Sequence, residues 1–371
     1  MLPKEFLMPR RTYTGEGCAL RILAEAAACG NTGLLVCDQV LEKSGMIAKI
    51  LANAPAGLNV TTHAHAGREP TTAEVDALRA TLRGAKPAFQ WIAAVGGGSV
   101  LDLAKGAAAL ADAAQPAAEF LTNPLPVPGA RVPLFMAPST AGTGSEATVV
   151  SVMIDPERGL KTSIRSASVI PQAVFLDPAM LASCPPRVIG ASGLDAFVQA
   201  VESYTSRNAT DFTRLLSGYA AQRVAESLSA VFHGDMSKAG ALCEGSFLAG
   251  VALSHARLGL VHGLAHPLGS RWAVPHGLTC ALCFPPVLRF NRDVSRQRMA
   301  ELAALIGGDV EARVRGWLDD FALPNAFAGQ TIRDREAIIK ETLASGSTKA
   351  NPRDVTAEEV SAMLDEIFAP V

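Results

Sequence analysis

Apolar residues follow two different patterns along this chain. Up to about residue 185, short apolar runs such as GLLVC and WIAAV alternate with Ala-rich stretches of helical character. Runs that are apolar throughout, rather than alternating with polar residues, are typical of parallel strands covered on both faces. The alternation of strands and helices therefore predicts an α/β fold around a parallel sheet. The predicted strands cover residues 33–37, 58–63, 91–95, 133–138, 147–154 and 173–177.

The second half of the chain has a helical pattern. From about residue 187 the β-branched runs disappear, and segments such as FTRLLSGYAAQRVAESLSAVF place apolar residues at helical spacing. The Cys-Pro-Pro sequence at 184–186 marks the change, because proline disfavours helix in the residue before it. We therefore predict two domains: a nucleotide-binding α/β domain over residues 1–185 and an all-helical domain over residues 186–371.

The composition excludes several classes of protein. Of the 371 residues, 49% are hydrophobic and 18% are charged, with 33 basic against 35 acidic side chains. The low charged fraction argues against a disordered chain, and the absence of a basic surplus argues against a nucleic-acid partner. No apolar run is long enough to span a membrane, and the charges in MLPKEFLMPRR are incompatible with a signal peptide.

The cysteines suit a reducing compartment. The seven cysteines are scattered along the chain, unlike those of a disulfide framework, so we expect a cytoplasmic protein. Cys280 and Cys283 form a CxxC, but no second pair exists and their neighbours are apolar. We therefore interpret these two residues as packed thiols rather than as ligands of zinc or a redox pair.

A glycine-rich turn follows directly after the run WIAAV. It consists of Gly96, Gly97, Gly98 and Ser99. Glycines let backbone amides approach a phosphate closely, and the start of a helix favours negative charge. Together with Asp102 and Lys105 on the helix that follows, the turn predicts a nucleotide phosphate site, although a plain strand-to-helix turn would use glycines in the same way.

Two further polar segments follow apolar strands. The segment PSTAGTGSE carries Ser139, Thr140 and Thr143, whose hydroxyls can hydrogen-bond a pyrophosphate or a ribose; a plain Ser/Thr/Gly loop is the alternative. Asp38 follows the run GLLVC, where a carboxylate accepts hydrogen bonds from the ribose diol and repels a 2′-phosphate. Asp38 thus favours NAD over NADP as the cofactor, with a helix-capping role as the alternative.

Three of the seven histidines lie close together in VHGLAHPLGSRWAVPHG. His262 and His266 are four residues apart, so a helix would place both imidazoles on one face, and His276 follows a Pro-containing turn. Asp195 and Gln199 are also four residues apart, in GLDAFVQAVESY. One carboxylate with two or three imidazoles can hold a divalent transition metal with an open position for substrate, whereas a cluster of hydrogen-bonded histidines is the alternative.

Five motifs resemble, in order and spacing, the iron-containing (group III) alcohol dehydrogenase family. They are GGGSVLDLAKG, PSTAGTGSEAT, GLDAFVQAVESY, GLVHGLAHPLGSRWAVPHG and KANPRD. The resemblance covers essentially the whole chain. It implies an N-terminal Rossmann-like domain that holds a nicotinamide cofactor and an all-α C-terminal domain that holds iron or zinc, the fold shared with dehydroquinate synthase.

The resemblance also implies roles for single residues. Asp195, His262 and His276 would ligate the metal, and His266 would help to relay the proton. Cofactor contacts would come from Asp38, Gly96, Gly97, Gly98, Ser99, Asp102, Ser139, Thr140, Thr143, Thr148 and Lys161.

Among this chain's departures from the family's pattern, two bear most directly on the metal and the substrate. Gln199 stands where the family usually has histidine, and an amide oxygen is a weaker and harder ligand than imidazole. The metal would then be held less tightly, be zinc, or have three protein ligands; a metal-free reductase resembling the maleylacetate reductases and a non-catalytic NAD-binding protein also stay open. Arg257 would pair with an anionic group on the substrate if it pointed inward, and would otherwise be a surface or domain-interface residue.

We therefore predict a cytoplasmic, metal-dependent, NAD(P)-linked alcohol dehydrogenase. It would transfer hydride reversibly between nicotinamide and a small primary alcohol or aldehyde, including one with an anionic group, with the help of Fe²⁺ or Zn²⁺. The resemblance implies a homodimer or larger assembly, and edge strands near the N-terminus can pair across a two-fold axis. The rival activity, a carbon–oxygen lyase resembling dehydroquinate synthase, needs more Lys and Arg than the segments around Asp195 and His262 supply.

Overall fold

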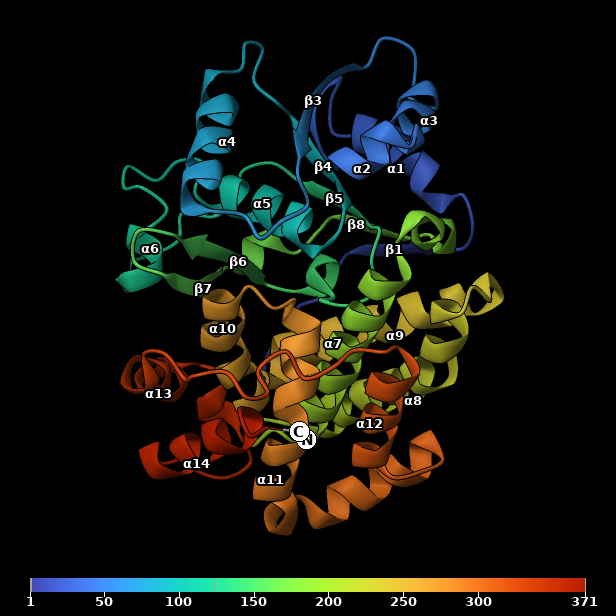
Figure 1. Cartoon of the computed structure of the whole chain (residues 1–371). Helices are drawn as coiled ribbons and strands as arrows, with labels where there is room; N and C mark the ends of the chain where they lie inside the picture. Colours follow the sequence, from blue (N-terminus) through green and yellow to red (C-terminus); the bar gives the residue numbers. More distant parts are fainter. Residues whose placement is uncertain (1, 124, 371) are drawn as a thin grey trace. The chain divides into compact units, whose positions relative to one another are not determined.

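The computed structural model describes residues 2–123 and 125–370, which form two compact units (Figure 1). The α/β unit comprises Leu7–Thr140 and Gly144–Cys184. The helical unit comprises the chain from Pro185 onwards, the segment Ala141–Thr143 and a short N-terminal stretch that ends at Phe6. These last two segments come from the part of the sequence in which we expected only the nucleotide-binding domain.

A six-stranded parallel sheet forms the centre of the α/β unit, with the order β1-β8-β5-β4-β2-β3. Its strands are β1 (Arg11–Thr14), β2 (Thr32–Asp38), β3 (Asn59–His65), β4 (Trp91–Gly96), β5 (Leu134–Pro138) and β8 (Ala173–Leu176). The unit's helices are α1 (Ile22–Ala27), α2 (Gln39–Lys43), α3 (Met46–Ala52), α4 (Thr72–Gly84), α5 (Gly98–Ala109) and α6 (Glu119–Thr122), with short 3-10 helices at Cys18–Arg21, Ser145–Ala147, Ala167–Val169 and Pro178–Ser183.

Alternate side chains of the central strands enter two separate cores. On β2, Leu34 and Val36 join one core with residues of α4 and α5, whereas Leu35 and Cys37 join the other with residues of α1 and α3. All four side chains are fully buried. This burial on both faces explains the unbroken apolar runs in the sequence and confirms the predicted α/β fold.

One predicted strand has a different place, and two strands, β1 and β7, were not predicted. The run at 147–154 corresponds to β6 (Val150–Asp155), which pairs antiparallel with β7 (Leu160–Arg165) outside the parallel sheet. Along β6, buried and half-buried positions alternate, as in a hairpin covered on one face. β1 escaped prediction because it lies at the edge of the sheet and its sequence, RTYT, is polar and largely exposed.

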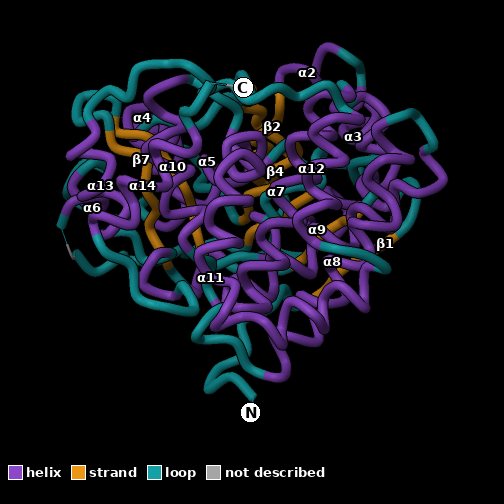
Figure 2. Tube along the Cα trace, turned by 60° about the horizontal axis from the view of Figure 1, so that its bottom comes forward, coloured by secondary structure: helices purple, strands orange, loops and turns teal. Residues whose placement is uncertain are grey.

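The helical unit is built around α7, which packs against α8, α9 and α11 (Figure 2). From Leu194 to its end, every residue of α7 is buried. The described helices are α7 (Pro186–Thr205), α8 (Asp211–Phe232), α9 (Ala239–Ala256), α10 (Leu260–Trp272), α11 (His276–Ile306), α12 (Val310–Asp320), α13 (Arg335–Ala344) and α14 (Ala357–Ile367), with 3-10 helices at Met236–Lys238 and Thr348–Ala350. The all-helical pattern predicted for this half is confirmed.

Among the described residues, no single helix is both long enough and apolar enough to cross a membrane. Among these residues, one pair of consecutive helical segments, Met236–Ala256 and Leu260–Trp272, is together long and apolar enough. The chain bends by 108° between the two segments.

Candidate functional site

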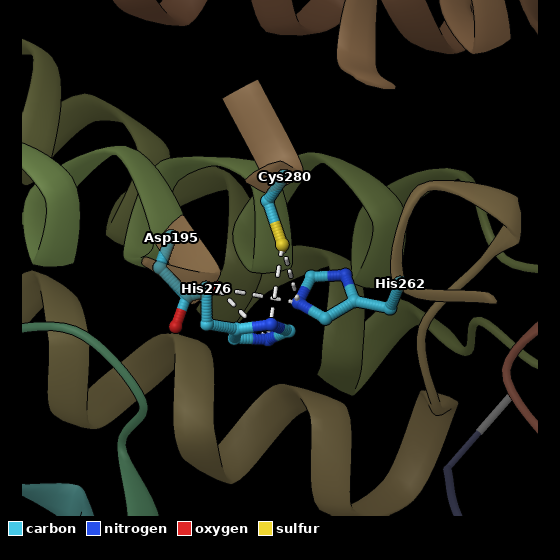
Figure 3. Close-up of side chains that lie close together, drawn as sticks. All are labelled: Asp195, His262, His276 and Cys280. Carbon is cyan, nitrogen blue, oxygen red and sulfur yellow. Dashed lines mark hydrogen bonds and ion pairs between the residues drawn. The ribbon is translucent and has the colours of Figure 1, made fainter. Parts of the chain in front are cut away.

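Four side chains of types that can bind a metal ion converge inside the helical unit (Figure 3). Asp195 comes from α7, His262 from α10, and His276 and Cys280 from the first turns of α11. One donor atom from each residue lies within 4.8 Å of all the others. Asp195, His262 and Cys280 are buried, and His276 is partly exposed. The structure thus brings together three of the four metal ligands predicted from the sequence and adds a cysteine.

The spacing of these atoms fits one divalent metal ion. His262 Nε2 lies 3.3 Å from Asp195 Oδ1, and His276 Nε2 lies 3.9 Å from the same oxygen. Cys280 Sγ lies 3.7 Å from His262 Nε2 and 3.8 Å from His276 Nε2. Bonds of about 2.1 Å to nitrogen or oxygen and about 2.3 Å to sulfur place tetrahedral neighbours roughly 3.4 to 3.6 Å apart. The four donors therefore need little movement to share one ion.

His262 is oriented by a second carboxylate. Its Nδ1 donates to Glu202 Oε2 at 2.6 Å, and Glu202 Oε1 accepts from the backbone N–H of Val261 at 2.7 Å. In the neutral imidazole, donation from Nδ1 leaves the lone pair of Nε2 directed at the cluster. This carboxylate–histidine arrangement fixes the tautomer and ring orientation that a metal ligand needs.

The remaining two predicted residues of this site lie nearby but outside the cluster. Gln199 is buried one turn after Asp195 on α7, and its Oε1 has no hydrogen-bond partner within the part of the chain that the structure describes. The ring of His266 lies 5.3 Å from that of His276 and is partly exposed. The sequence did contain a signal for the missed Cys280, because it follows His276 by four residues and so shares its face of α11.

The glycine-rich turn joins β4 to α5, as the sequence predicted. β4 ends at Gly96, Gly97 caps α5 without a side-chain hydrogen bond, and the helix begins at Gly98. Gly96 pairs with Pro138 at the end of β5, and the Gly96 carbonyl accepts from the N–H of Ser139 at 2.9 Å. The turn and the start of the second polar segment therefore lie together at the carboxyl edge of the sheet.

A buried polar network connects α5 to the segment around Ser145, next to this turn. Lys105 is fully buried, and its Nζ donates to the Ser145 carbonyl at 2.8 Å and to Thr148 Oγ1 at 2.9 Å. Ser145 Oγ donates to Asp102 Oδ1 at 2.6 Å. Burial lowers the pKa of Lys105 and raises the pKa of Asp102, while the attraction between the two groups opposes both shifts. These side chains hold α5 to the Ser145 segment; that Asp102 and Thr148 also contact a cofactor stays a prediction.

The other predicted cofactor residues are placed as follows. Asp38 ends β2 and caps α2, accepting from the Val40 N–H at 2.8 Å, which is the helix-capping role that we kept as an alternative. Lys161, on β7, pairs with Glu69 at 2.7 Å. Thr143 belongs to the short segment that is part of the helical unit.

Arg257 ends α9 with an unusual backbone conformation. Its φ is 61° and its ψ is −176°, a region populated almost entirely by glycine, and the residue is exposed. Strain of this kind destabilises the folded state by about 1 to 3 kcal/mol, and glycine would relieve it. Glycine also makes the unfolded chain more flexible, which offsets roughly 0.5 to 1 kcal/mol of that gain. We expect Arg257→Gly to raise the free energy of unfolding by about 1 kcal/mol in urea titrations.

The variant Arg257→Ala separates the backbone from the side chain. It removes the guanidinium but keeps the strained conformation, so it should not show the gain in stability. Equal stability of the two variants would contradict the strain. If Arg257 also binds an anionic substrate, both variants should raise KM for that substrate alike.

Comparisons with known proteins agree with this architecture. Residues 9–178 match the family model for iron-containing alcohol dehydrogenase, and residues 189–368 match the model for the C-terminal part of the Fe-containing alcohol dehydrogenase family. The chain is 37% identical over 303 residues to the probable alcohol dehydrogenase EutG of Salmonella typhimurium, covering 81% of this chain and 76% of that protein. It is 34% identical to the 1-propanol dehydrogenase PduQ of Citrobacter freundii, covering 98% and 100%.

A solved structure shares the whole fold. The sulfoacetaldehyde reductase from Bifidobacterium kashiwanohense, in complex with NAD⁺, superimposes with a TM-score of 0.89 at 25% identity, and the match covers 99% of both chains. The family that the motifs suggested is therefore confirmed. This chain belongs to the iron-containing alcohol dehydrogenase family and is an NAD(P)-linked, metal-dependent oxidoreductase.

Proposed function

We propose that this enzyme interconverts a small primary alcohol and its aldehyde by hydride transfer to or from NAD(H). The observation that carries the proposal is the convergence of Asp195, His262 and His276 on one buried point of the helical unit. When Fe²⁺ or Zn²⁺ is bound there, it polarises the substrate's oxygen. The carboxylate of Glu202 keeps His262 in the ligating tautomer.

The α/β unit binds the cofactor in this proposal. Backbone amides at the start of α5 bind the pyrophosphate, because Gly97 leaves them without a side-chain cap. Asp38 has one oxygen on the Val40 amide, which leaves the other for a ribose hydroxyl and favours NAD over NADP. Contacts to the rest of the cofactor come from Ser139, Thr140 and Lys161 of this unit. That Thr143, which belongs to the helical unit, also contacts the cofactor stays a prediction.

His266 relays the proton. Its ring lies beside that of His276 and is partly exposed, so it can exchange a proton with solvent while the metal ligands stay fixed. Histidine suits this role because its ordinary pKa lies near neutral pH.

We also propose a homo-oligomer in the cytoplasm. β1 lies at an edge of the parallel sheet and is largely exposed, which supports pairing with a second copy. The scattered cysteines support a reducing compartment.

The test is NADH oxidation with a panel of small aldehydes, neutral and anionic, after loading the purified protein with Fe²⁺ or Zn²⁺. We expect turnover that disappears on chelation and returns with the metal. Turnover that persists in a metal-free preparation would support a metal-free reductase instead. The absence of turnover together with intact NADH binding would support a non-catalytic NAD-binding protein.

A further inference from the structure

We propose that the thiolate of Cys280, rather than the amide of Gln199, is the fourth protein ligand of the metal. The resulting donor set is one carboxylate, two imidazoles and one thiolate, and the substrate oxygen would add as a fifth donor. This inference deepens the proposed function, because it rests on metal binding by Asp195, His262 and His276 and specifies the rest of the site.

The first argument is geometric. Cys280 Sγ lies 3.7 and 3.8 Å from the Nε2 atoms of His262 and His276. A tetrahedral ion with ordinary metal–sulfur and metal–nitrogen bonds would separate these atoms by about 3.6 Å. The sulfur therefore already stands at the distance of a fourth ligand from both imidazoles (Figure 3).

The second argument concerns the lone pairs that these side chains offer to a metal ion. His262 donates its Nδ1 proton to Glu202, so the neutral imidazole offers its Nε2 lone pair to a metal ion. Asp195 adds a carboxylate oxygen 3.3 Å away. A divalent cation can accept a lone pair from each of these donors at once. On binding, the thiol releases its proton to solvent and the sulfur lone pair bonds to the metal.

The third argument is position. Cys280 lies one turn after His276, the first residue of α11, so both side chains project from the same face of that helix. The adjacent CxxC partner does not share this role: Cys283 is buried on the same helix but is not among the converging side chains. Cys280 therefore differs from an ordinary packed cysteine, because it lies among side chains that can bind a metal ion.

A thiolate changes which metal the site prefers. Soft sulfur ligands favour zinc over harder ions such as Mn²⁺, whereas an amide oxygen would shift the preference the other way. We therefore expect Zn²⁺ and Co²⁺ to bind more tightly than Mn²⁺.

The experiment is a Co²⁺ titration of the metal-free protein, followed by absorption spectroscopy. A cobalt–thiolate bond produces an intense charge-transfer band in the near ultraviolet, which carboxylate, imidazole and amide ligands do not. We expect this band in the wild-type protein at one equivalent of Co²⁺. X-ray absorption of the zinc form should show one sulfur at about 2.3 Å.

A matched pair of variants tests which cysteine provides the sulfur ligand. Cys280→Ala should lose the band and bind Zn²⁺ more weakly by over about 100-fold, beyond the 10- to 100-fold effect of residues that only orient ligands. Cys283→Ala makes the same change at a buried site of the same helix, and both its band and its affinity should match wild type. Gln199→Ala should also keep the band.

The outcomes separate this inference from the proposed function. Stoichiometric metal without the band, and with no sulfur in the zinc spectrum, overturns the thiolate ligand and leaves the metal-dependent dehydrogenase intact. Failure to bind metal at all overturns both. Because the wild-type spectra suffice for this decision, it does not depend on whether Cys280→Ala folds.

Discussion

The variant His262→Ala is expected to lose its metal and at least about 1,000-fold in kcat/KM, since metal polarisation of the substrate oxygen supplies several kcal/mol of barrier reduction. His262 contributes the Nε2 atom nearest to Asp195, at 3.3 Å. Its removal also leaves the buried carboxylates of Asp195 and Glu202 facing a cavity without their shared partner. Metal content by elemental analysis and NADH oxidation with the best aldehyde measure the two losses.

A second histidine of the same unit provides the control. His233 ends α8, is mostly exposed and bonds to Asp320, so His233→Ala changes the same residue type outside the cluster. We expect this variant to keep its metal and its activity. Full activity in metal-free His262→Ala would contradict the role of the cluster in catalysis.

The fold was predictable because each half of the chain obeys one simple pattern. Leu34 and Leu35 are neighbours in sequence but enter opposite cores, and only a sheet covered on both faces makes both positions apolar. The strand β1 was not predictable in this way. It lies at the edge, where pairing through the backbone places little demand on its side chains.

The site was only partly predictable, because sequence spacing shows a shared helix face but not which helices meet. Asp195, His262 and His276 were predicted from their residue types and motifs. Cys280 was interpreted as a packed thiol, and its proximity to His262 depends on how α10 and α11 pack together. Likewise, Lys105 was predicted to support phosphate binding, whereas its ammonium is fully buried on Ser145 and Thr148.

Gly277 shows how such packing determines the metal site, and Gly277→Ala is expected to disrupt it. Gly277 is the second residue of α11, between His276 and the turn that carries Cys280. A Cβ there would lie 1.8 Å from the Ala191 carbonyl oxygen on α7 and 3.1 Å from Asp195 Cβ. Backbone cannot yield as a flexible side chain can, so the start of α11 must move away from α7.

This movement should weaken metal binding more than it lowers the stability of the fold. Overpacking costs about 1 to 3 kcal/mol, which lowers the melting temperature without necessarily unfolding the protein. The displacement separates His276 and Cys280 from Asp195, and a misplacement of about 1 Å costs catalysis about 100-fold. We expect at least that loss in kcat/KM, together with weaker Zn²⁺ binding in competition with a chromophoric chelator.

A helical glycine with open space around its Cβ position gives the matched control for this substitution. Gly316 lies on the exposed face of α12, and a Cβ there meets nothing within 4 Å. Gly316→Ala should stabilise the protein by roughly 0.5 to 1 kcal/mol through helix propensity alone and leave metal affinity unchanged. If Gly277→Ala behaved in the same way, the close approach of α11 to α7 would not be what holds the donors together. If it lost metal while staying folded, the contact between two backbones would be as necessary to the site as the ligands themselves.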